Sequence, residues 1–393
     1  MIFTNSTVFL DGHYEKASFR VENGRFDKIA RTPGELTPGA SEEVIDCKGK
    51  KIIPGLFDIH THGCLGLDFT FSGADDDRKM LRYYAKSGVT EVLATTMTSA
   101  PEVYKKACSE IKTLKNNTDP ALARVRGINA EGPFLSLEKK GAHDPNYIKP
   151  VDAAYYSELN RLSGNIIRLI TIAPETEGAM DFIKTHAASG PSCDVRCDED
   201  KVVVSLGHSD CGYDTAMEGF KAGADHVTHL YNAMNGLHHR KPGIPAAAAD
   251  ANAWVELICD GLHVHEAVIR HAFKAYPGRV VLISDSIAPS GLPDGQYSSG
   301  GLPVFLKNGE IRLEDGTLAG SGITLFEGLK RCVTRFNVPE EEAVLAATYN
   351  PAVSVGLSDR CGRIAEGLDA DFLIIGDDFS LDAVYIAGQP LSK

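Results

Sequence analysis

The sequence has no apolar run as long as a transmembrane helix, and it does not begin like a secretory signal peptide. The first residues, MIFTNSTVFLDGHYE, lack the basic segment and the long apolar stretch of a leader. The nine cysteines are scattered, and the closest pair, Cys193 and Cys197, has no second pair nearby. We therefore expect reduced thiols, no metal site built from cysteine, and a cytoplasmic location.

Low-complexity segments, fixed-period repeats and an excess of basic residues are also missing. The net charge of −13 argues against nucleic acid or an anionic membrane as the main partner, although local cations can still hold an anionic small molecule. With 43% hydrophobic and 24% charged residues, the 393-residue chain is typical of a globular protein with one large and one small domain.

From residue 55 onward, short β-rich segments alternate with helical ones, which is the pattern of a parallel α/β fold. We expect strands over 55–60, 90–96, 125–131, 166–173, 201–208, 225–230, 254–260 and 279–285, and helices over 75–87, 101–115, 212–222 and 265–275. Eight β/α units in roughly 250 residues favour a closed (β/α)8 barrel. An open doubly wound sheet is the alternative, but no glycine-rich dinucleotide turn follows the early strands.

The first expected strand ends in the sequence GLFDIHTHG, with two histidines one residue apart. Because side chains alternate along a strand, His60 and His62 point the same way. Two imidazoles side by side at a strand end are costly unless something binds them, and a divalent metal is the commonest such partner. A pair of hydrogen-bonded histidines near a loop is the alternative for this stretch taken alone.

Polar residues also end four other strands, and together with the first pair they number six: His60, His62, Glu131, His208, His229 and Asp285. In a barrel, the carboxyl ends of all strands meet at one mouth, where barrel enzymes keep their chemistry. Each residue alone has an ordinary explanation; Asp285, for example, is a good helix cap in "SDS". Because all six residues lie at strand ends, the pattern favours one shared metal site.

The ligand types narrow the chemistry of this site. Histidine nitrogens and carboxylate oxygens without thiolates suit zinc, iron(II), manganese or cobalt. The six residues can hold one metal with spare groups, or two metals bridged by Glu131. A water in an open coordination position would have its pKa lowered toward neutrality, and Asp285 would act as general base and then as general acid.

Eight motifs spread along nearly the whole chain carry a family resemblance. They are PGLFDIHTHG (54–63), GINAEGPFL (127–135), KKGAH (139–143), SLGHSD (205–210), VTHLYNAM (227–234), DGLHV (260–264), LISDS (282–286) and LAGS (318–321). With them the chain resembles the amidohydrolase superfamily of metal-dependent hydrolases, and more narrowly the N-acetylglucosamine-6-phosphate deacetylase family. EGPFL together with GAH and HLYNAM is specific, because dihydroorotases, hydantoinases and adenosine deaminases do not share that set.

The resemblance implies a role for each metal-binding residue. Glu131, His208 and His229 would hold the main metal, and His60 and His62 would help to hold a second one. Zinc is the expected metal, with iron, manganese or cobalt as alternatives, at one or two ions per subunit. The fourth strand offers no lysine for carboxylation, so Glu131 would do the bridging.

The resemblance also implies the substrate contacts. His143 of GAH would contact the acetamido carbonyl and stabilise the oxyanion, unless it merely caps a turn. Arg240, in the locally basic loop NGLHHRKPG (235–243), would bind the phosphate with help from His263, while His238, His239 and Lys241 remain alternatives to Arg240. The remaining expected substrate contacts are Ala142, Asn232 and Ala233, the last two through their backbone amides. In the family this phosphate site is completed across a dimer interface, so we expect a homodimer.

The two ends of the chain are β-like but too poor in apolar residues to fold alone. We expect residues 1–53 and 360–393 to form one small β-sandwich domain, as in this superfamily, beside a barrel domain over 54–359. Helices expected over 322–335 and 339–349 would close the barrel side.

The implied reaction is metal-dependent hydrolysis of the acetamide of N-acetylglucosamine 6-phosphate, giving glucosamine 6-phosphate and acetate. Three alternatives stay open at this point. They are the same chemistry on N-acetylgalactosamine 6-phosphate, a different amidohydrolase reaction on another amide, and a metal-silent relative that serves as a binding protein.

Overall fold

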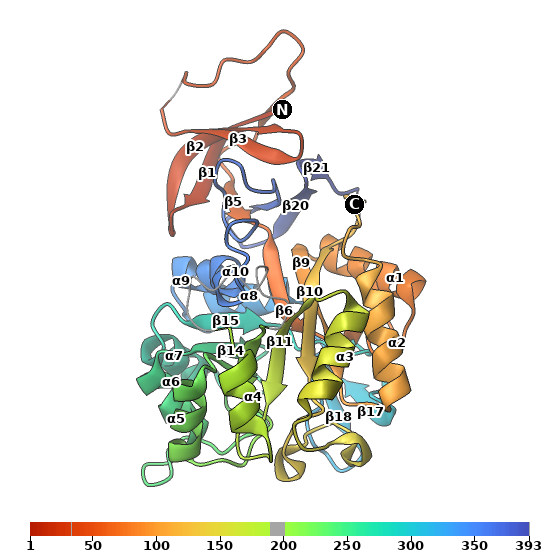
Figure 1. The fold of residues 1–393 in the computed structure, drawn as a ribbon. Helices are drawn as coiled ribbons and strands as arrows, with labels where there is room; N and C mark the ends of the chain where they lie inside the picture. The colour runs from red at the N-terminus through yellow and green to blue at the C-terminus, as the bar shows by residue number, and fades with distance from the viewer. Residues whose placement is uncertain (33, 189–200, 393) are drawn as a thin grey trace.

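The structure is a computed structural model, which describes residues 1–32, 34–188 and 201–392. The expectation for Cys193 and Cys197 lies outside the described residues. The chain forms a barrel with surrounding helices and a small β domain at one end, which contains both termini (Figure 1). In the described part of the chain, no helix has both the length and the apolar character needed to cross a membrane.

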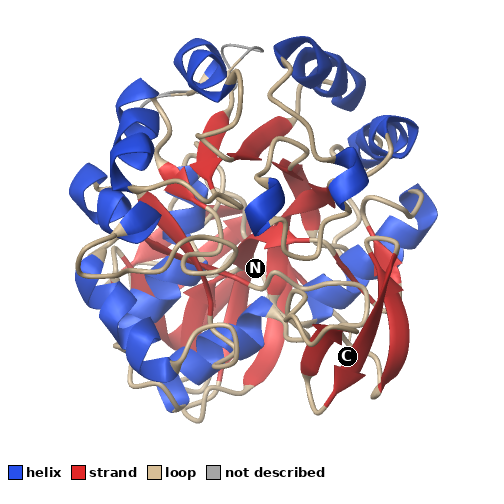
Figure 2. Ribbon diagram, turned by 90° about the horizontal axis from the view of Figure 1, so that it is seen from below, coloured by secondary structure: helices blue, strands red, loops and turns tan. Residues whose placement is uncertain are grey.

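The barrel sheet contains eight parallel strands that are hydrogen-bonded in chain order. They are β6 (Leu56–Thr61), β9 (Val89–Met97), β10 (Arg124–Glu131), β11 (Ile167–Ile172), β12 (Val203–Leu206), β13 (His226–Val227), β14 (Trp254–Ile258) and β15 (Val280–Ile283). Viewed along its axis, the sheet is enclosed by a ring of helices (Figure 2). The predicted (β/α)8 barrel is therefore confirmed.

The first and last strands of the barrel are joined at the mouth by backbone and side-chain hydrogen bonds. The backbone N–H of Asp285 donates to the carbonyl of His60 at 2.9 Å. The buried carboxylate of Asp58 accepts from the backbone N–H of Ser284 and from that of His60, both at 3.3 Å. Barrel closure therefore places the segment after β15 directly beside the two histidines of β6.

Ten helices pack around the sheet in the described part of the chain. They are α1 (Ala74–Lys86), α2 (Pro101–Lys112), α3 (Ala153–Ser163), α4 (Ala179–His186), α5 (Tyr213–Ala222), α6 (Gly243–Ala251), α7 (Glu266–Ala275), α8 (Leu325–Thr334), α9 (Glu340–Ala347) and α10 (Tyr349–Ser354). Local sequence sets several ends: the Asp152 side chain caps α3, and Gly164 ends it in a left-handed conformation at φ 74°. The helices predicted from the sequence are present with shifts of a few residues.

The small β domain is built from both ends of the chain. Its strands are β1 (Ile2–Leu10), β2 (His13–Glu22), β3 (Arg25–Ala30), β4 (Val44–Asp46), β5 (Lys51–Pro54), β19 (Phe372–Ile375), β20 (Leu381–Ile386) and β21 (Gln389–Pro390). They surround an aromatic core of Phe3, Phe19, Phe26, Phe372 and Tyr385. The expected small domain is confirmed, and its boundaries at 53/54 and 359/360 stay a prediction.

An ion-pair network joins the small domain to the barrel. Arg126 of β10 pairs with Glu91 of β9, and its guanidinium also lies 2.6 Å from a carboxylate oxygen of Asp369. Arg124 lies 2.7 Å from the same Asp369 oxygen and 3.2 Å from Asp371. Two arginines thus pair with the three neighbouring carboxylates at this junction.

Two features of the fold differ from the sequence expectation. Strands β12, β13 and β15 end at Leu206, Val227 and Ile283, two or three residues before the predicted ends, because the backbone leaves the strand conformation there. An antiparallel sheet of β16 (Gly295–Ser299), β17 (Leu302–Lys307) and β18 (Glu310–Leu313) follows β15 and was not predicted. Its largely exposed strands lack a clear apolar alternation in the sequence.

The remaining short elements are β7 (Gly63–Cys64), β8 (Leu67–Asp68), η1 (Leu137–Lys139) and η2 (Pro145–Tyr147).

The aromatic core makes the small domain testable. Phe372 is fully buried, and its ring contacts Phe3 and Tyr385 from opposite ends of the chain. Substitution Phe372→Ala should lower the free energy of unfolding by roughly 3–5 kcal/mol, measured by urea denaturation. Phe305→Ala, at an exposed ring of β17, is the matched control and should change it by about 0.5 kcal/mol or less. Equal losses in the two variants would contradict the proposed core.

Candidate functional site

Three of the predicted site residues lie just past their strands in a left-handed backbone conformation. His208, His229 and Asp285 each stand two residues after a barrel strand, with φ values of 46°, 27° and 48°. Such values are uncommon for residues other than glycine and concentrate at functional sites. The turns direct these side chains into the mouth, beside His60, His62 and Glu131 on β6 and β10.

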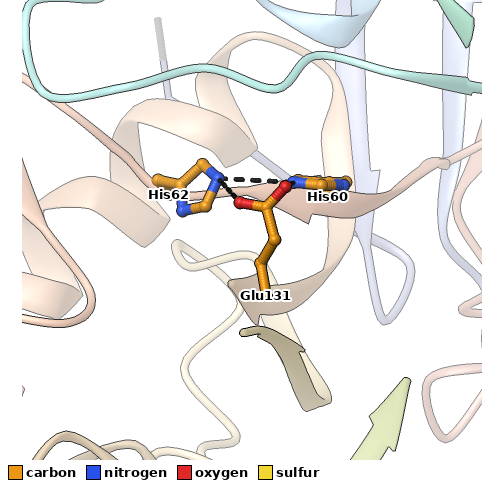
Figure 3. A group of neighbouring side chains, drawn as sticks. All are labelled: His60, His62 and Glu131. Carbon is orange, nitrogen blue, oxygen red and sulfur yellow. Dashed lines mark hydrogen bonds and ion pairs between the residues drawn. The ribbon is translucent and has the colours of Figure 1, made fainter. Parts of the chain in front are cut away.

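The carboxylate of Glu131 lies at the centre of the cluster and is only 3% exposed. Its Oε1 is 3.0 Å from His229 Nε2, 3.1 Å from His208 Nε2 and 3.4 Å from His60 Nε2. Its Oε2 is 3.1 Å from His62 Nε2. Figure 3 shows the rings of His60 and His62 directing their nitrogens at this carboxylate. Burial raises the pKa of Glu131, but the nearby imidazoles, His60 first among them, outweigh burial and hold it well below the usual value.

Hydrogen bonds on the far side of two rings fix their tautomers. His208 Nδ1 donates to the backbone carbonyl of Lys139 at 2.8 Å, and His60 Nδ1 donates to the Glu256 carboxylate at 2.8 Å. With the proton on Nδ1, the neutral form of either ring directs its Nε2 lone pair at the cluster. Burial also lowers the pKa of His208 to about 4, so this ring is neutral at pH 7.

The donor set fits a divalent metal. His208 Nε2 and His229 Nε2 are 3.0 Å apart, and His60 Nε2 and His62 Nε2 are 3.3 Å apart, each pair beside the same carboxylate. Ring nitrogens that converge at such distances around a carboxylate are stabilised by a cation between them. The chain therefore contains a histidine–glutamate–histidine metal-binding cluster, made of two ligand groups that share Glu131.

His143 lies beside the cluster but has the opposite tautomer. The backbone N–H of Thr98 donates to His143 Nδ1 at 3.2 Å, so the neutral ring carries its proton on Nε2. This Nε2 is 3.2 Å from Glu131 Oε2. His143 is thereby prepared to donate a hydrogen bond, which suits contact with a carbonyl oxygen better than metal ligation.

Asp285 is 8% exposed and faces the histidine pair of β6. Its Oδ1 lies 3.4 Å from His62 Nε2 and 3.6 Å from His60 Nε2. Burial raises the pKa of Asp285, yet the hydrogen bond from His62 and the other imidazoles bring it below the usual value. At neutral pH the side chain is an ionised carboxylate that can accept a proton.

A cavity of about 290 Å³ opens above the cluster and collects most of the predicted site residues. The predicted residues that line it are His62, Glu131, Ala142, His143, His208, His229, Asn232, Ala233, His263 and Asp285. His60 is fully buried at the cluster. Arg240 is different: it is exposed and is not among the described residues that line the cavity. The structure therefore does not bring Arg240 to the metal cluster within one chain.

The unpredicted three-stranded sheet forms the opposite, apolar wall of the cavity. Val304 of β17 packs with Ile287 and Ala319, and all three line the cavity. Sequence reasoning missed this wall, because the strands that build it are short.

Three residues that hold the site together were also missed. Glu256 bonds to His60, Thr98 bonds to His143, and Asp260 Oδ2 lies 2.6 Å from His263 Nδ1. Two of them leave a trace in the sequence. A lone glutamate inside the apolar strand WVELI and an aspartate three residues before His263 are both unusual enough to note.

Comparisons with known proteins agree with this geometry. The sequence profile of the Amidohydrolase family matches residues 52–391. The chain is 34% identical over 369 residues to the N-acetylglucosamine-6-phosphate deacetylase of Vibrio furnissii, covering 94% of this chain and 88% of that protein. It is 30% identical over 380 residues to the N-acetylgalactosamine-6-phosphate deacetylase of Escherichia coli O157:H7, covering 96% of each. The crystal structure of the N-acetylglucosamine-6-phosphate deacetylase of Pasteurella multocida superposes with a TM-score of 0.90 at 28% identity, covering 100% and 99% of the two chains.

The shared carboxylate predicts how metal content responds to substitution. Glu131→Ala removes a donor from both ligand groups, so the dialysed protein should lose nearly all bound metal. His62→Ala leaves the group of Glu131, His208 and His229 intact and should retain metal there. Metal content per chain, measured by elemental mass spectrometry, checks the expectation for each variant. Wild-type metal content in Glu131→Ala would show that the carboxylate is not a ligand.

Proposed function

This chain belongs to the amidohydrolase family, and we propose that it hydrolyses the acetamide of N-acetylglucosamine 6-phosphate to glucosamine 6-phosphate and acetate. One observation carries the proposal beyond the family. An ionised carboxylate, a hydrogen-bond donor and a metal-binding cluster face a single cavity, as Asp285, His143 and the group around Glu131. Metal-assisted hydrolysis of an amide uses these three functions together.

The metal-binding residues would be those of the cluster. Glu131, His208 and His229 would hold the main ion, and His60 and His62 would join Glu131 in holding a second. We expect zinc, with iron, manganese or cobalt as alternatives, since all suit nitrogen and oxygen donors. A divalent metal bound there supplies Lewis acidity, which activates water and polarises the amide carbonyl.

Two side chains handle the protons and the developing charge. Asp285 accepts the proton of the attacking water, for which its lowered pKa keeps it ionised, and then delivers that proton to the departing amine. The amine is a poor leaving group, so a positioned acid matters for this step. His143 donates its Nε2 proton in a hydrogen bond to the carbonyl oxygen, whose negative charge grows in the tetrahedral intermediate.

The phosphate requires cations at the rim of the cavity. His263 lines the cavity, and Asp260 orients its ring. Arg240 is exposed outside the cavity, which favours a phosphate site completed by the partner in a homodimer, with backbone amides of Asn232 and Ala233 facing the ligand. His238, His239 and Lys241 stay alternative cations. Sedimentation velocity should give a mass of about twice the 42.3 kDa of one chain, and a monomer in solution would exclude a phosphate site shared between two chains.

We place the reaction in the cytoplasm, where buried free thiols such as Cys47 and Cys108 persist. Cell fractionation tests this location.

The galacto epimer of the substrate is the second candidate, because it differs at one hydroxyl group. The higher identity to the Vibrio furnissii protein, 34% against 30% for the Escherichia coli protein, favours the gluco epimer. A different amide substrate is a third candidate. The basic loop (235–243) and the cavity histidine His263 argue against it, because both suit a phosphate.

Acetate release from purified protein tests the function. We expect N-acetylglucosamine 6-phosphate to be preferred over its galacto epimer and over unphosphorylated N-acetylglucosamine. A kcat/KM at least tenfold lower for unphosphorylated N-acetylglucosamine would show that the enzyme recognises the phosphate. A preference for the galacto epimer would support the proposed chemistry and identify the epimer as the substrate. No acetate from any of the three, with metal present in the protein, would reject the proposal.

Asp285→Asn tests the proton transfer separately from the fold. The amide is nearly isosteric but cannot accept the proton, so kcat should fall by about 10²–10⁴-fold. Metal content should stay near that of the wild type, because the cluster of Glu131, His208 and His229 is unchanged. Steady-state kinetics and metal analysis on the same preparation check both. Wild-type turnover in this variant would refute the acid–base role of Asp285.

A further inference from the structure

Glu256 is a buried carboxylate for which the proposed reaction has no direct use. It lies in the middle of β14 and is 0% exposed. Its neighbours Val255 and Leu257 pack into the main apolar core with the helices, so the Glu256 side chain points to the other face of the strand. That face is the interior of the barrel.

The contacts of Glu256 cross the barrel. Strand β14 is hydrogen-bonded to β13 and β15, and His60 belongs to β6, on the far side of β15. The same carboxylate oxygen, Oε2, accepts from His60 Nδ1 at 2.8 Å and from the backbone N–H of His229 at 3.1 Å. One oxygen therefore holds a residue from each of the two ligand groups that share Glu131.

The hydrogen bonds that this carboxylate accepts come from the candidate metal site. In the described part of the chain, both hydrogen bonds accepted by the Glu256 side chain come from candidate metal ligands. The second oxygen, Oε1, has no hydrogen-bond partner there and lies 3.8 Å from Nδ1 of the buried His226.

We propose that Glu256 is a positioning residue of the metal centre that couples its two ligand groups. Through His60 it holds the proton on Nδ1, so that the Nε2 lone pair faces the cluster. Through the N–H of His229 it supports the left-handed backbone at φ 27° from which that imidazole reaches the same carboxylate, Glu131. A carboxylate behind a ligating histidine typically contributes 10–100-fold to metal affinity.

The inference rests on the metal centre of the proposed function and not on its substrate. Metal titration therefore separates the two. A protein that binds metal normally but releases no acetate from any sugar would reject the substrate and leave the role of Glu256 standing.

The test is a titration of metal-free protein with Co²⁺, followed by the visible absorption of the bound ion and by metal content after dialysis. Glu256→Gln keeps the shape but removes the charge, and it should weaken Co²⁺ binding by about 10–100-fold and alter the spectrum. Asp77→Asn is the matched control, because Asp77 of α1 is also 0% exposed and has no contact with the cluster among the described residues. It should bind Co²⁺ like the wild type. Equal Co²⁺ affinity and spectrum in Glu256→Gln and the wild type would overturn the proposal.

A measurement on the wild type keeps the proposal testable if Glu256→Gln does not fold. Nitrogen-15 NMR of labelled histidines in metal-free and Zn²⁺-loaded protein reports the tautomer of His60. We expect a protected Nδ1 proton on His60 in both states, with the Nε2 signal shifting on Zn²⁺ addition. A proton on Nε2 of His60 in the metal-free protein at neutral pH, with Nδ1 unprotonated, would overturn the proposal by itself.

Discussion

The site depends on the backbone hydrogen bonds that close the barrel at its seam, from the N–H of Asp285 to the carbonyl of His60 and from the N–H of His62 to the carbonyl of Ser286. Without closure, the eighth strand would have no contact with the first, and the carboxylate of Asp285 would stand far from the histidine pair. Asp58 reinforces this seam by accepting from the backbone on both sides of it. The residue that completes the barrel is thus also the residue proposed to carry the proton. Fold and chemistry therefore share a single constraint, and disruption of the seam would affect both.

A second consequence of closure is electrostatic. It surrounds the buried carboxylate of Glu131 with imidazole nitrogens at 3.0–3.4 Å, where the cost of burying a charge is high unless cations or donors compensate it. The hydrogen bonds behind the rings assign different roles to similar residues. His208 and His60 donate from Nδ1 and present lone pairs, whereas His143 accepts at Nδ1 and presents a proton. Side chains of one type therefore divide into candidate ligands and a hydrogen-bond donor through backbone and carboxylate partners outside the cluster.

The sequence predicted the barrel because strand and helix signals are local, and eight β-rich segments alternate with helical ones from residue 55 onward. It also predicted which residues meet, since parallel strands bring their carboxyl ends to one mouth. It did not predict the left-handed turns at His208 and His229, because nothing in the side chains favours such backbone. Glu256 was missed for another reason: its partner His60 lies on a strand that is distant in sequence and not adjacent in the sheet. The sheet of β16, β17 and β18 was missed because its short strands depend on packing against Ile287 and Ala319.

The left-handed residues raise the question of what maintains them, since each costs on the order of 1–3 kcal/mol. Each is held by hydrogen bonds from a neighbouring segment. The carbonyl of His208 accepts from the N–H of Ser136 at 2.8 Å, and the carbonyl of Asp285 accepts from the N–H of Ser321 at 2.7 Å. At His229 the carbonyl accepts from the N–H of Asn232 at 2.9 Å, and the N–H of His229 in addition donates to the side chain of Glu256. The strain at two positions is thus offset by backbone hydrogen bonds, whereas at the third a buried carboxylate that also holds His60 contributes as well. A substitution at Glu256 would therefore release a strained turn and a ligand ring together, which is why its effect should exceed that of losing either hydrogen bond alone.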